Sequence, residues 1–483
     1  MNREDILKLI KSNPEAVADL LLFSFQQIEE LKKIIQEQNE RIQELERKLA
    51  KDSNNSSKPP STDGFKKKRK SNRGKSKRSP GGQKGHNGQT LQLVDNPDNV
   101  KIDKISNCIH CGHRFNKDQK RIKRRQEIEI PPIELEVIEY QIEEGECPCC
   151  GKVTSGIFPE HITKAIQYGQ RFRSFMVYLS QYQLIPYERT VELCNDLFNY
   201  SFSKGTLFNF IKECYNKLKY PEAEIKNIIT QSYVVNFDES GGYCNGSRGW
   251  FHVASTESLT FFSFHEKRGR EAMDEIGILP NFTGIAVHDF YASYLKYKSA
   301  HALCNGHLLR ELKFLHEEEG QMWALKLKDL IEEINDKVNS YKEIGKRNSL
   351  IPSKLISFEI EYEKIIKAGL RKNPRNKGKP GKRGRPKQND ARKLLERLSK
   401  WKKSYLAFMY DFNIPFDNNQ AERDIRMLKV QQKISGCFRS EFGAKFFCRI
   451  RGYISTVRKN NQNVLEALVM AFKGKPFIPN YAE

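Results

Sequence analysis

The sequence lacks any apolar run that approaches the ~18–20 residues of a membrane-spanning helix. Its N-terminus also lacks the basic and then apolar pattern of a secretory signal peptide. Both absences predict a soluble protein of the cytoplasm with no membrane partner. Cysteines stay reduced in that compartment. We therefore expect the clustered members of the 11 cysteines to bind metal rather than to form disulfides.

Acidic residues are scarce in two short segments. Overall, 83 Lys and Arg face 60 Asp and Glu, which gives a formal charge of +23. Segments 58–89 and 371–393 each hold 11 basic residues and one acid, so together they carry +20. Two such segments favour a nucleic acid as partner, although single charge runs are often only solvated linkers. The candidate DNA contacts within them are Lys66, Lys67, Lys68, Arg69, Lys84, Arg383 and Arg385.

The second basic segment contains a short motif, Arg383-Gly384-Arg385-Pro386 with flanking lysines. Extended arginine side chains on a narrow Gly/Pro backbone fit an A·T minor groove, and the motif resembles an AT-hook. A plain basic loop explains a motif of this length equally well.

Residues 1–52 read as a helical segment. An a/d heptad seam runs along its second half, in the series Ile28, Leu31, Ile35, Gln38, Ile42, Leu45 and Leu49. The seam predicts a coiled coil through which the chain associates with itself. An amphipathic helix folded back onto its own domain is the alternative. The breaker-rich stretch that follows makes residues 53–93 a basic linker rich in Gly, Pro and Ser.

Residues 94–160 form a cysteine module. Cys108 and Cys111 make one CxxC-Gly knuckle, and Cys147 and Cys150 make a second. Four such thiolates suit a structural zinc ion, because they leave no open coordination position for catalysis. The alternation of apolar and polar residues over 125–140 predicts a hairpin between the knuckles, in a zinc-ribbon-like arrangement. Cys149 lies between the last two ligands and is an ambiguous further candidate.

Residues 161–230 read as helical. One helix opens at Pro186, and Ser203 is a candidate N-cap for the next. Two helices joined by a short turn resemble a helix-turn-helix that reads DNA. Two packed helices with no role in DNA binding fit the same pattern equally well.

Residues 231–472 have a mixed α/β pattern. Apolar strands are expected at 233–237, 249–254, 259–264 and 286–288, and a helix is expected to begin at Tyr291. Asp238 and Asp289 follow two of these strands, and Glu422 shares a helical face with Arg426. An aspartate after a strand is often only a turn residue. Three carboxylates from separated segments can nevertheless hold two Mg²⁺ or Mn²⁺ ions ~3.5–4 Å apart.

Four motifs resemble signatures of the insertion-sequence-66 group of bacterial DDE transposases. They are Asp238-Glu239, His288-Asp289, the stretch 304–312 and the stretch 417–423. The resemblance covers nearly the whole multidomain α+β chain, including the N-terminal helix, the basic segment and the CxxC module. It implies an RNase H-like catalytic domain with the triad Asp238, Asp289 and Glu422. It also implies a helical insertion, at about 318–412, and we take residues 473–483 as a C-terminal tail.

Basic residues near these acids are further candidates for DNA contacts. The candidates are Arg310, Arg423, Arg426 and Lys429, although a solvated helix face would look the same. His307 either contacts phosphate or supports the metal ligands, or it is hydrogen-bonded locally within a packed helix. Cys304 and His307 have the spacing of metal ligands, but no second pair lies nearby in the sequence.

The function that we expect is DNA transposition. The N-terminal modules would bind the terminal inverted repeats of an insertion sequence, and the catalytic domain would cleave DNA and join its 3′-hydroxyls to target DNA with Mg²⁺. Pairing of two ends favours a homo-oligomer, and the resemblance implies accessory proteins of the same element and a place at the bacterial nucleoid. The alternatives are a non-catalytic DNA-binding regulator from a decayed element and a stand-alone nuclease.

Overall fold

The computed structural model describes residues 3–52, 91–345, 347–376 and 386–480. It divides into two compact units. The smaller comprises Lys70–Thr163 and Leu193–Ser201, and the larger comprises Met1–Arg69, Lys164–Glu192 and Phe202–Glu483. Among the described helices, none is both long and apolar enough to cross a membrane. The candidate DNA contacts that lie outside the described residues are Lys66, Lys67, Lys68, Arg69, Lys84, Arg383 and Arg385.

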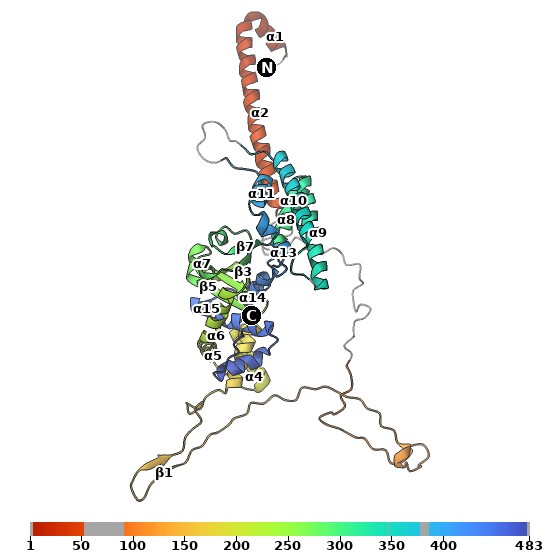
Figure 1. Ribbon diagram of the computed structural model, residues 1–483, viewed down its shortest axis with the longest axis vertical. Helices are drawn as coiled ribbons and strands as arrows, with labels where there is room; N and C mark the ends of the chain where they lie inside the picture. The colour runs from red at the N-terminus through yellow and green to blue at the C-terminus, as the bar shows by residue number, and fades with distance from the viewer. Residues whose placement is uncertain (1–2, 53–90, 346, 377–385, 481–483) are drawn as a thin grey trace. The chain divides into compact units, whose positions relative to one another are not determined.

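A five-stranded mixed sheet forms the centre of the larger unit (Figure 1). Its spatial order is β5-β4-β3-β6-β7. The first three strands pair antiparallel, whereas β3, β6 and β7 run parallel. The strands are β3 (Val234–Cys244), β4 (Ser247–Ser255), β5 (Thr260–His265), β6 (Ile285–His288) and β7 (Ala300–Leu303). The expected mixed α+β class is thereby confirmed.

Strand β3 is longer than the sequence suggests. The expected strand covers 233–237, because the apolar run ends there, but pairing with β4 continues as far as Cys244. The hairpin turns through Asn245 and Gly246, whose φ angles of 48° and 75° fit a two-residue turn. Gly242 is required by packing, because a Cβ there would lie 2.7 Å from the Phe251 ring. Asp238 therefore lies within a strand, opposite Val253, and not after one.

Helices cover both faces of the sheet. Ala421, Ile425 and Leu428 of α14 (Asn419–Ser435) pack with Phe447 of α15 (Glu441–Lys459) against one face. The opposite face packs against α6 (Lys219–Gln231) and α7 (Arg270–Ile276), where Met273 is buried. The expected helix at Tyr291 is wrong, since only a 3₁₀ turn at Tyr294–Lys296 precedes β7.

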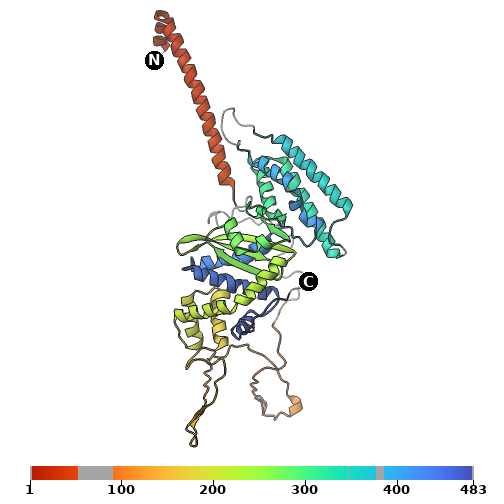
Figure 2. The same cartoon turned by 60° about the vertical axis from the view of Figure 1, so that its left-hand side comes forward.

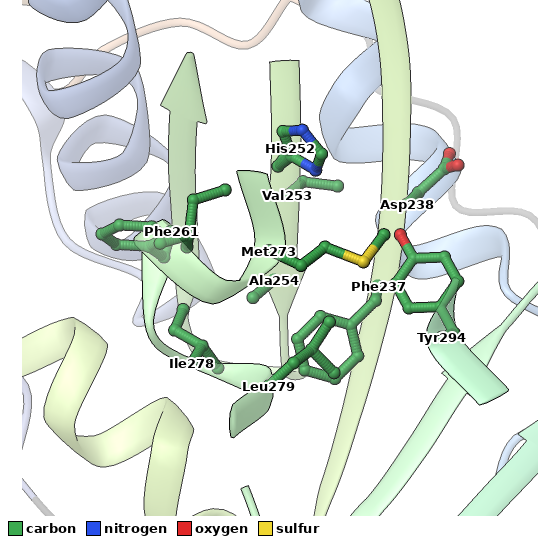
Figure 3. A pocket seen from close by; sticks show the side chains of 11 residues that line it. Phe237, Asp238, His252, Val253, Ala254, Phe261, Met273, Ile278, Leu279 and Tyr294 are labelled. Carbon is green, nitrogen blue, oxygen red and sulfur yellow. The ribbon is translucent and has the colours of Figure 1, made fainter. Parts of the chain in front are cut away.

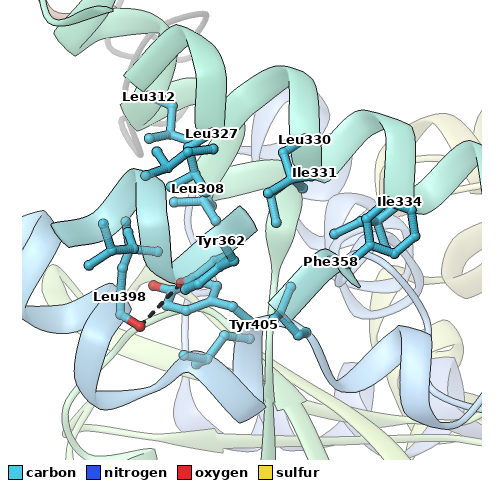
Figure 4. Packing of buried hydrophobic residues seen from close by; sticks show 14 of the residues in the cluster. Leu308, Leu312, Leu327, Leu330, Ile331, Ile334, Phe358, Tyr362, Leu398 and Tyr405 are labelled. Carbon is cyan, nitrogen blue, oxygen red and sulfur yellow. Dashed lines mark hydrogen bonds between the residues drawn. The ribbon is translucent and has the colours of Figure 1, made fainter. Parts of the chain in front are cut away.

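A helical insertion separates β7 from α14. Its helices are α8 (Asn305–Glu317), α9 (Met322–Ile344), α10 (Pro352–Lys372), α11 (Asp390–Lys400), α12 (Lys402–Tyr405) and α13 (Ala407–Tyr410). They enclose an apolar core in which the Tyr362 hydroxyl donates to the Leu398 carbonyl at 3.1 Å (Figure 4). The same core includes Val287 of β6 and Ala302 and Leu303 of β7, so the insertion packs directly against this edge of the sheet.

The N-terminal helices are α1 (Arg3–Ser12) and α2 (Pro14–Ala50), and Asn13 caps α2 through the amide of Ala16. The a/d seam of α2 is exposed, with Ile35 at 58% and Leu45 at 45%. Figure 2 shows α2 as one long, continuous helix. Its end is held by ion pairs from Arg47 to Glu319 and from Lys51 to Asp390. The coiled coil stays a prediction.

Helices also precede the sheet and follow α15. They are α3 (Gln170–Val177), a π-helical turn (Tyr178–Tyr182), α4 (Tyr187–Phe198), α5 (Lys204–Lys217) and α16 (Val464–Phe472). Ser203 caps α5, since its hydroxyl accepts from the Thr206 amide at 3.1 Å. This confirms the predicted N-cap, while a DNA-reading role stays a prediction.

The smaller unit contains little regular structure. Its elements are a 3₁₀ turn (Lys117–Gln119) and the strand pair β1 (Glu144–Glu146) and β2 (Val153–Ser155) around the second knuckle. The hairpin expected over 125–140 is wrong, because no strand forms there. Pro131 and Pro132 lack the backbone N–H that a ladder needs, and Val137 is 93% exposed.

Candidate active site

Asp238 lies in the middle of β3 at the centre of the sheet. Its Oδ1 accepts a hydrogen bond from the Glu239 amide at 2.8 Å. Burial raises its pKa well above the usual value, and the charges of Glu239, Asp289 and Glu422 raise it further. The three candidate acids thus lie close enough together for their charges to interact.

Asp289 follows β6, the strand that pairs parallel with β3. Its Oδ1 accepts from the Tyr291 amide at 3.0 Å, which fixes the carboxylate in the turn after the strand. Burial raises its pKa to about 6, with a further contribution from the charge of Glu239. The sequence placed this residue correctly, immediately after a buried strand.

Glu422 lies in the first turn of α14, and Asn418 fixes that turn to the sheet. The Asn418 side chain donates to the Phe237 carbonyl at 2.8 Å and accepts from Asn236 at 2.9 Å. Because Asn236 and Phe237 directly precede Asp238, this buried clamp holds Glu422 beside that strand. The role of Asn418 was missed from sequence, where it read only as a turn residue.

The charge balance of the three acids suits divalent cations. Burial and mutual repulsion raise the pKa of Asp238 and of Asp289, and burial raises that of Glu422. Among the described residues, Glu422 Oε1 is buried without a hydrogen-bond partner. Oxygen ligands with unbalanced negative charge are what Mg²⁺ requires. The three residues therefore fit the metal that the resemblance implies.

Comparison with protein families settles the class of the chain. The pattern of the IS66 transposase family matches residues 165–446, which span the sheet, the insertion and all three acids. The chain belongs to the IS66 transposase family. Membership gives it a role in DNA transposition and implies that it binds DNA. A family of unknown function, DUF6444, matches residues 13–92. The comparison with curated proteins found no match.

A fourth acid of this IS66-family chain, Glu239, lies beside the triad, but an arginine neutralises its charge. Its side chain is 1% exposed and pairs with Arg268 at 2.6 Å, and the Tyr294 hydroxyl donates to it. Arg268 also stacks on the Tyr291 ring at 4.1 Å. Glu239 is thus already paired with the guanidinium of Arg268, whereas Asp238 on the opposite face of β3 has no such ion pair among the described residues. No pattern in the sequence indicates this division of roles.

A small cavity lies between the sheet and α7, and Asp238 is among the residues that line it (Figure 3). Its volume of about 20 Å³ admits roughly one water molecule. The rest of its lining is mainly apolar and includes Phe237, Met273 and Leu279. A nucleotide is too large to enter this cavity.

The predicted DNA contacts of the IS66-family chain differ in their surroundings. Arg310 and Arg426 lie close enough to Glu422 for their charges to lower its pKa, against the larger effect of burial. Arg423 is exposed and donates to Gln420 at 3.0 Å. Lys429 is half-buried and donates to the Gly241 carbonyl, so its ammonium helps to attach α14 to β3.

His307 and Cys304 lie directly beside Glu422. His307 Nδ1 is 3.3 Å from Cys304 Sγ and 3.7 Å from Glu422 Oε1. In the described part of the chain, these three side chains form the one group of at least three potential ligands within 4.8 Å of one another. The triad acids need not meet that limit, because ligands of two bridged Mg²⁺ ions can be on the order of 8 Å apart.

The four knuckle cysteines form two similar turns. Gly112 and Gly151 adopt φ angles of 74° and 68°. Their backbone amides donate to the backbone carbonyls of Cys108 and Cys147, at 2.9 Å in both cases. Hydrogen bonds from neighbouring amides lower the pKa of both these thiols. Each turn is suited to hold a thiolate pair, but within the described residues the two pairs are not gathered into one site.

Proposed function

We propose that this transposase cleaves and joins DNA in an RNase H-like domain through Asp238, Asp289 and Glu422. The observation that carries the proposal is the interaction of these carboxylates, which come from β3, the end of β6 and the start of α14. The strand order with an antiparallel β5-β4-β3 half and a parallel β3-β6-β7 half supports it.

Two Mg²⁺ ions bound by the three carboxylates would activate the attacking water or 3′-hydroxyl and stabilise the leaving oxygen. The protein side chains position the groups for this chemistry. Asn418 orients the turn that carries Glu422, and the backbone amides of Glu239 and Tyr291 orient Asp238 and Asp289. Arg310 and Arg426 supply positive charge at the Glu422 side, where they would hold a DNA phosphate.

The same proposal assigns end recognition to the N-terminal regions. The cysteine module would bind structural Zn²⁺ through Cys108, Cys111, Cys147 and Cys150, and α2 would join two chains on paired DNA ends. The two similar knuckle turns and the exposed apolar seam of α2 support these assignments. The terminal inverted repeats of the element would be the DNA sequence bound.

Strand transfer with Asp289→Asn tests the triad. The substrate would be duplex DNA carrying the inverted repeats that flank the gene, with a supercoiled plasmid as target and Mg²⁺ as metal. We expect loss of both cleavage and joining, because the amide removes one negative ligand. Asp336→Asn, which alters an exposed carboxylate on α9, is the matched control and should leave both reactions intact.

Retained strand transfer in Asp289→Asn would overturn the triad. Cleavage without joining by the wild-type chain would instead favour a stand-alone nuclease. Neither reaction by the wild-type chain would favour a non-catalytic DNA-binding protein.

A further inference from the structure

Two helix starts converge on one small group of ligand atoms. Cys304 directly precedes α8, His307 lies in the first turn of α8, and Glu422 lies in the first turn of α14. The partial positive charge of a helix N-terminus stabilises a thiolate or carboxylate placed there. Burial and the charge of Glu422 nevertheless raise the pKa of the Cys304 thiol to about 12, so a cation has to displace its proton on binding.

The spacing of the three atoms matches a tetrahedral ion. Zinc bound at ~2.3 Å from sulfur and ~2.0 Å from nitrogen holds those two atoms ~3.5 Å apart. His307 Nδ1 lies 3.3 Å from Cys304 Sγ and 3.7 Å from Glu422 Oε1. Two of the three separations thus match edges of one coordination tetrahedron, and the third, from the sulfur to the carboxylate, lies within 4.8 Å.

The contacts around Cys304 and Glu422 are compatible with a bound cation. The Asn418 amide donates to Cys304 Sγ at 3.2 Å, as a donor to a metal-bound thiolate would. Within the described residues, the buried Glu422 Oε1 has no hydrogen-bond partner. A sulfur and an imidazole nitrogen select a thiophilic transition metal over Mg²⁺, which prefers oxygen.

We propose that Cys304, His307 and Glu422 form a Zn²⁺ site distinct from the four-cysteine module, with solvent as the fourth ligand. Binding displaces the Cys304 thiol proton to solvent. The inference rests on the proposed function in one respect, because Glu422 is shared with the Mg²⁺ site. Zn²⁺ bound here removes Glu422 from the catalytic set and acts as an inhibitor that competes with Mg²⁺.

Zinc stoichiometry of the full-length chain tests the site directly. Wild type, Cys304→Ser and Cys448→Ser are dialysed against Zn²⁺ and their metal content is measured. Cys448→Ser is the matched control, because it removes another buried thiol from α15. We expect one Zn²⁺ fewer per chain in Cys304→Ser alone. Co²⁺ in place of Zn²⁺ should show a weaker thiolate charge-transfer absorption in the same variant.

Inhibition gives a second readout. Mg²⁺-dependent cleavage by each variant is titrated with Zn²⁺ and normalised to its own zinc-free rate. Loss of an outer hydrogen bond to a metal ligand weakens metal binding ~10–100-fold, so loss of the thiolate itself should raise the half-inhibitory Zn²⁺ concentration by at least about tenfold. His307→Gln should act in the same direction, which covers the case that Cys304→Ser does not fold.

The outcomes separate the two proposals. Equal zinc content and equal inhibition in wild type and Cys304→Ser would overturn the Zn²⁺ site while leaving the triad untouched. Cys304-dependent zinc binding in a chain that never cleaves DNA would support the site and overturn the proposed catalysis. Asp238→Asn tests both proposals in one variant. It should abolish cleavage and yet bind as much zinc as wild type.

Discussion

The sheet region and the cysteine module are stabilised in different ways. Val235 and Ala286 of the sheet are fully buried at 0% exposure, whereas Ile109 and Val137 of the module are 92% and 93% exposed. The sheet is therefore stabilised by apolar burial, at about 25 cal/mol per Å². The module has no comparable core in its described residues, and its ordered parts are the two cysteine turns. The proposed Zn²⁺ would therefore have to supply folding energy to the cysteine module. The proposed Mg²⁺ would supply only chemistry to the sheet region.

The largest effect should follow from removing the zinc that we propose for the module. Structural zinc contributes about 10–16 kcal/mol in small zinc domains, so Cys108→Ser should abolish ordered structure in 94–160. Hydrogen exchange should show this loss while the amides of β3 and β6 stay protected. Cys437→Ser is the control, since it removes an exposed thiol outside the module. Equal loss of protection in both regions would break the comparison.

A smaller but clear effect is expected from the apolar core. Leu327→Ala removes a fully buried side chain from the insertion and should lower the free energy of unfolding by about 2–5 kcal/mol. Val137→Ala, in the exposed part of the module, should change it by less than about 0.5 kcal/mol. Denaturant unfolding measures both. A similar cost for the two variants would show that the module buries Val137.

Removal of the clamp at Asn418 should lower the free energy of unfolding modestly and the rate of DNA cleavage strongly. Asn418→Ala leaves the Asn236 and Phe237 groups unpaired in a buried position, which costs about 1–3 kcal/mol. Cleavage should fall much further than stability, because the turn carrying Glu422 loses its attachment to β3. Asn413→Ala, an exposed amide on the preceding loop, is the control. Normal cleavage in Asn418→Ala would assign the clamp a purely structural role.

The elements that the sequence predicted well are those with a local signal. Alternating and apolar runs indicated four strands of the sheet, and Ser203 indicated a helix start that the structure confirms. Asp289 was predicted correctly because an acid directly follows a short apolar run. Strand β7 was missed, since Ala300–Leu303 is brief and carries His301 in its middle.

Contacts between distant segments had no such signal. The pairing of Glu239 with Arg268 depends on which face of β3 each acid occupies, and the sequence does not record what covers each face. The meeting of Cys304 with Asn418, across 114 positions, depends on how the insertion returns to the sheet. The position of Glu422 beside Cys304 and His307 was missed for the same reason.

The two ends of the helical insertion are joined to each other at the sheet. The Asn305 amide donates to the Phe416 carbonyl at 3.1 Å, and the Asn418 amide donates to Cys304 Sγ at 3.2 Å. Seen from the sheet, the insertion is therefore a closed loop whose ends are fixed whatever lies between them. Loop-closure entropy grows by only about 0.6 kcal/mol for each doubling of loop length. A longer insertion accordingly adds little loop-closure cost to the position of Glu422, as long as its helices still fill the apolar core that they share with β6 and β7.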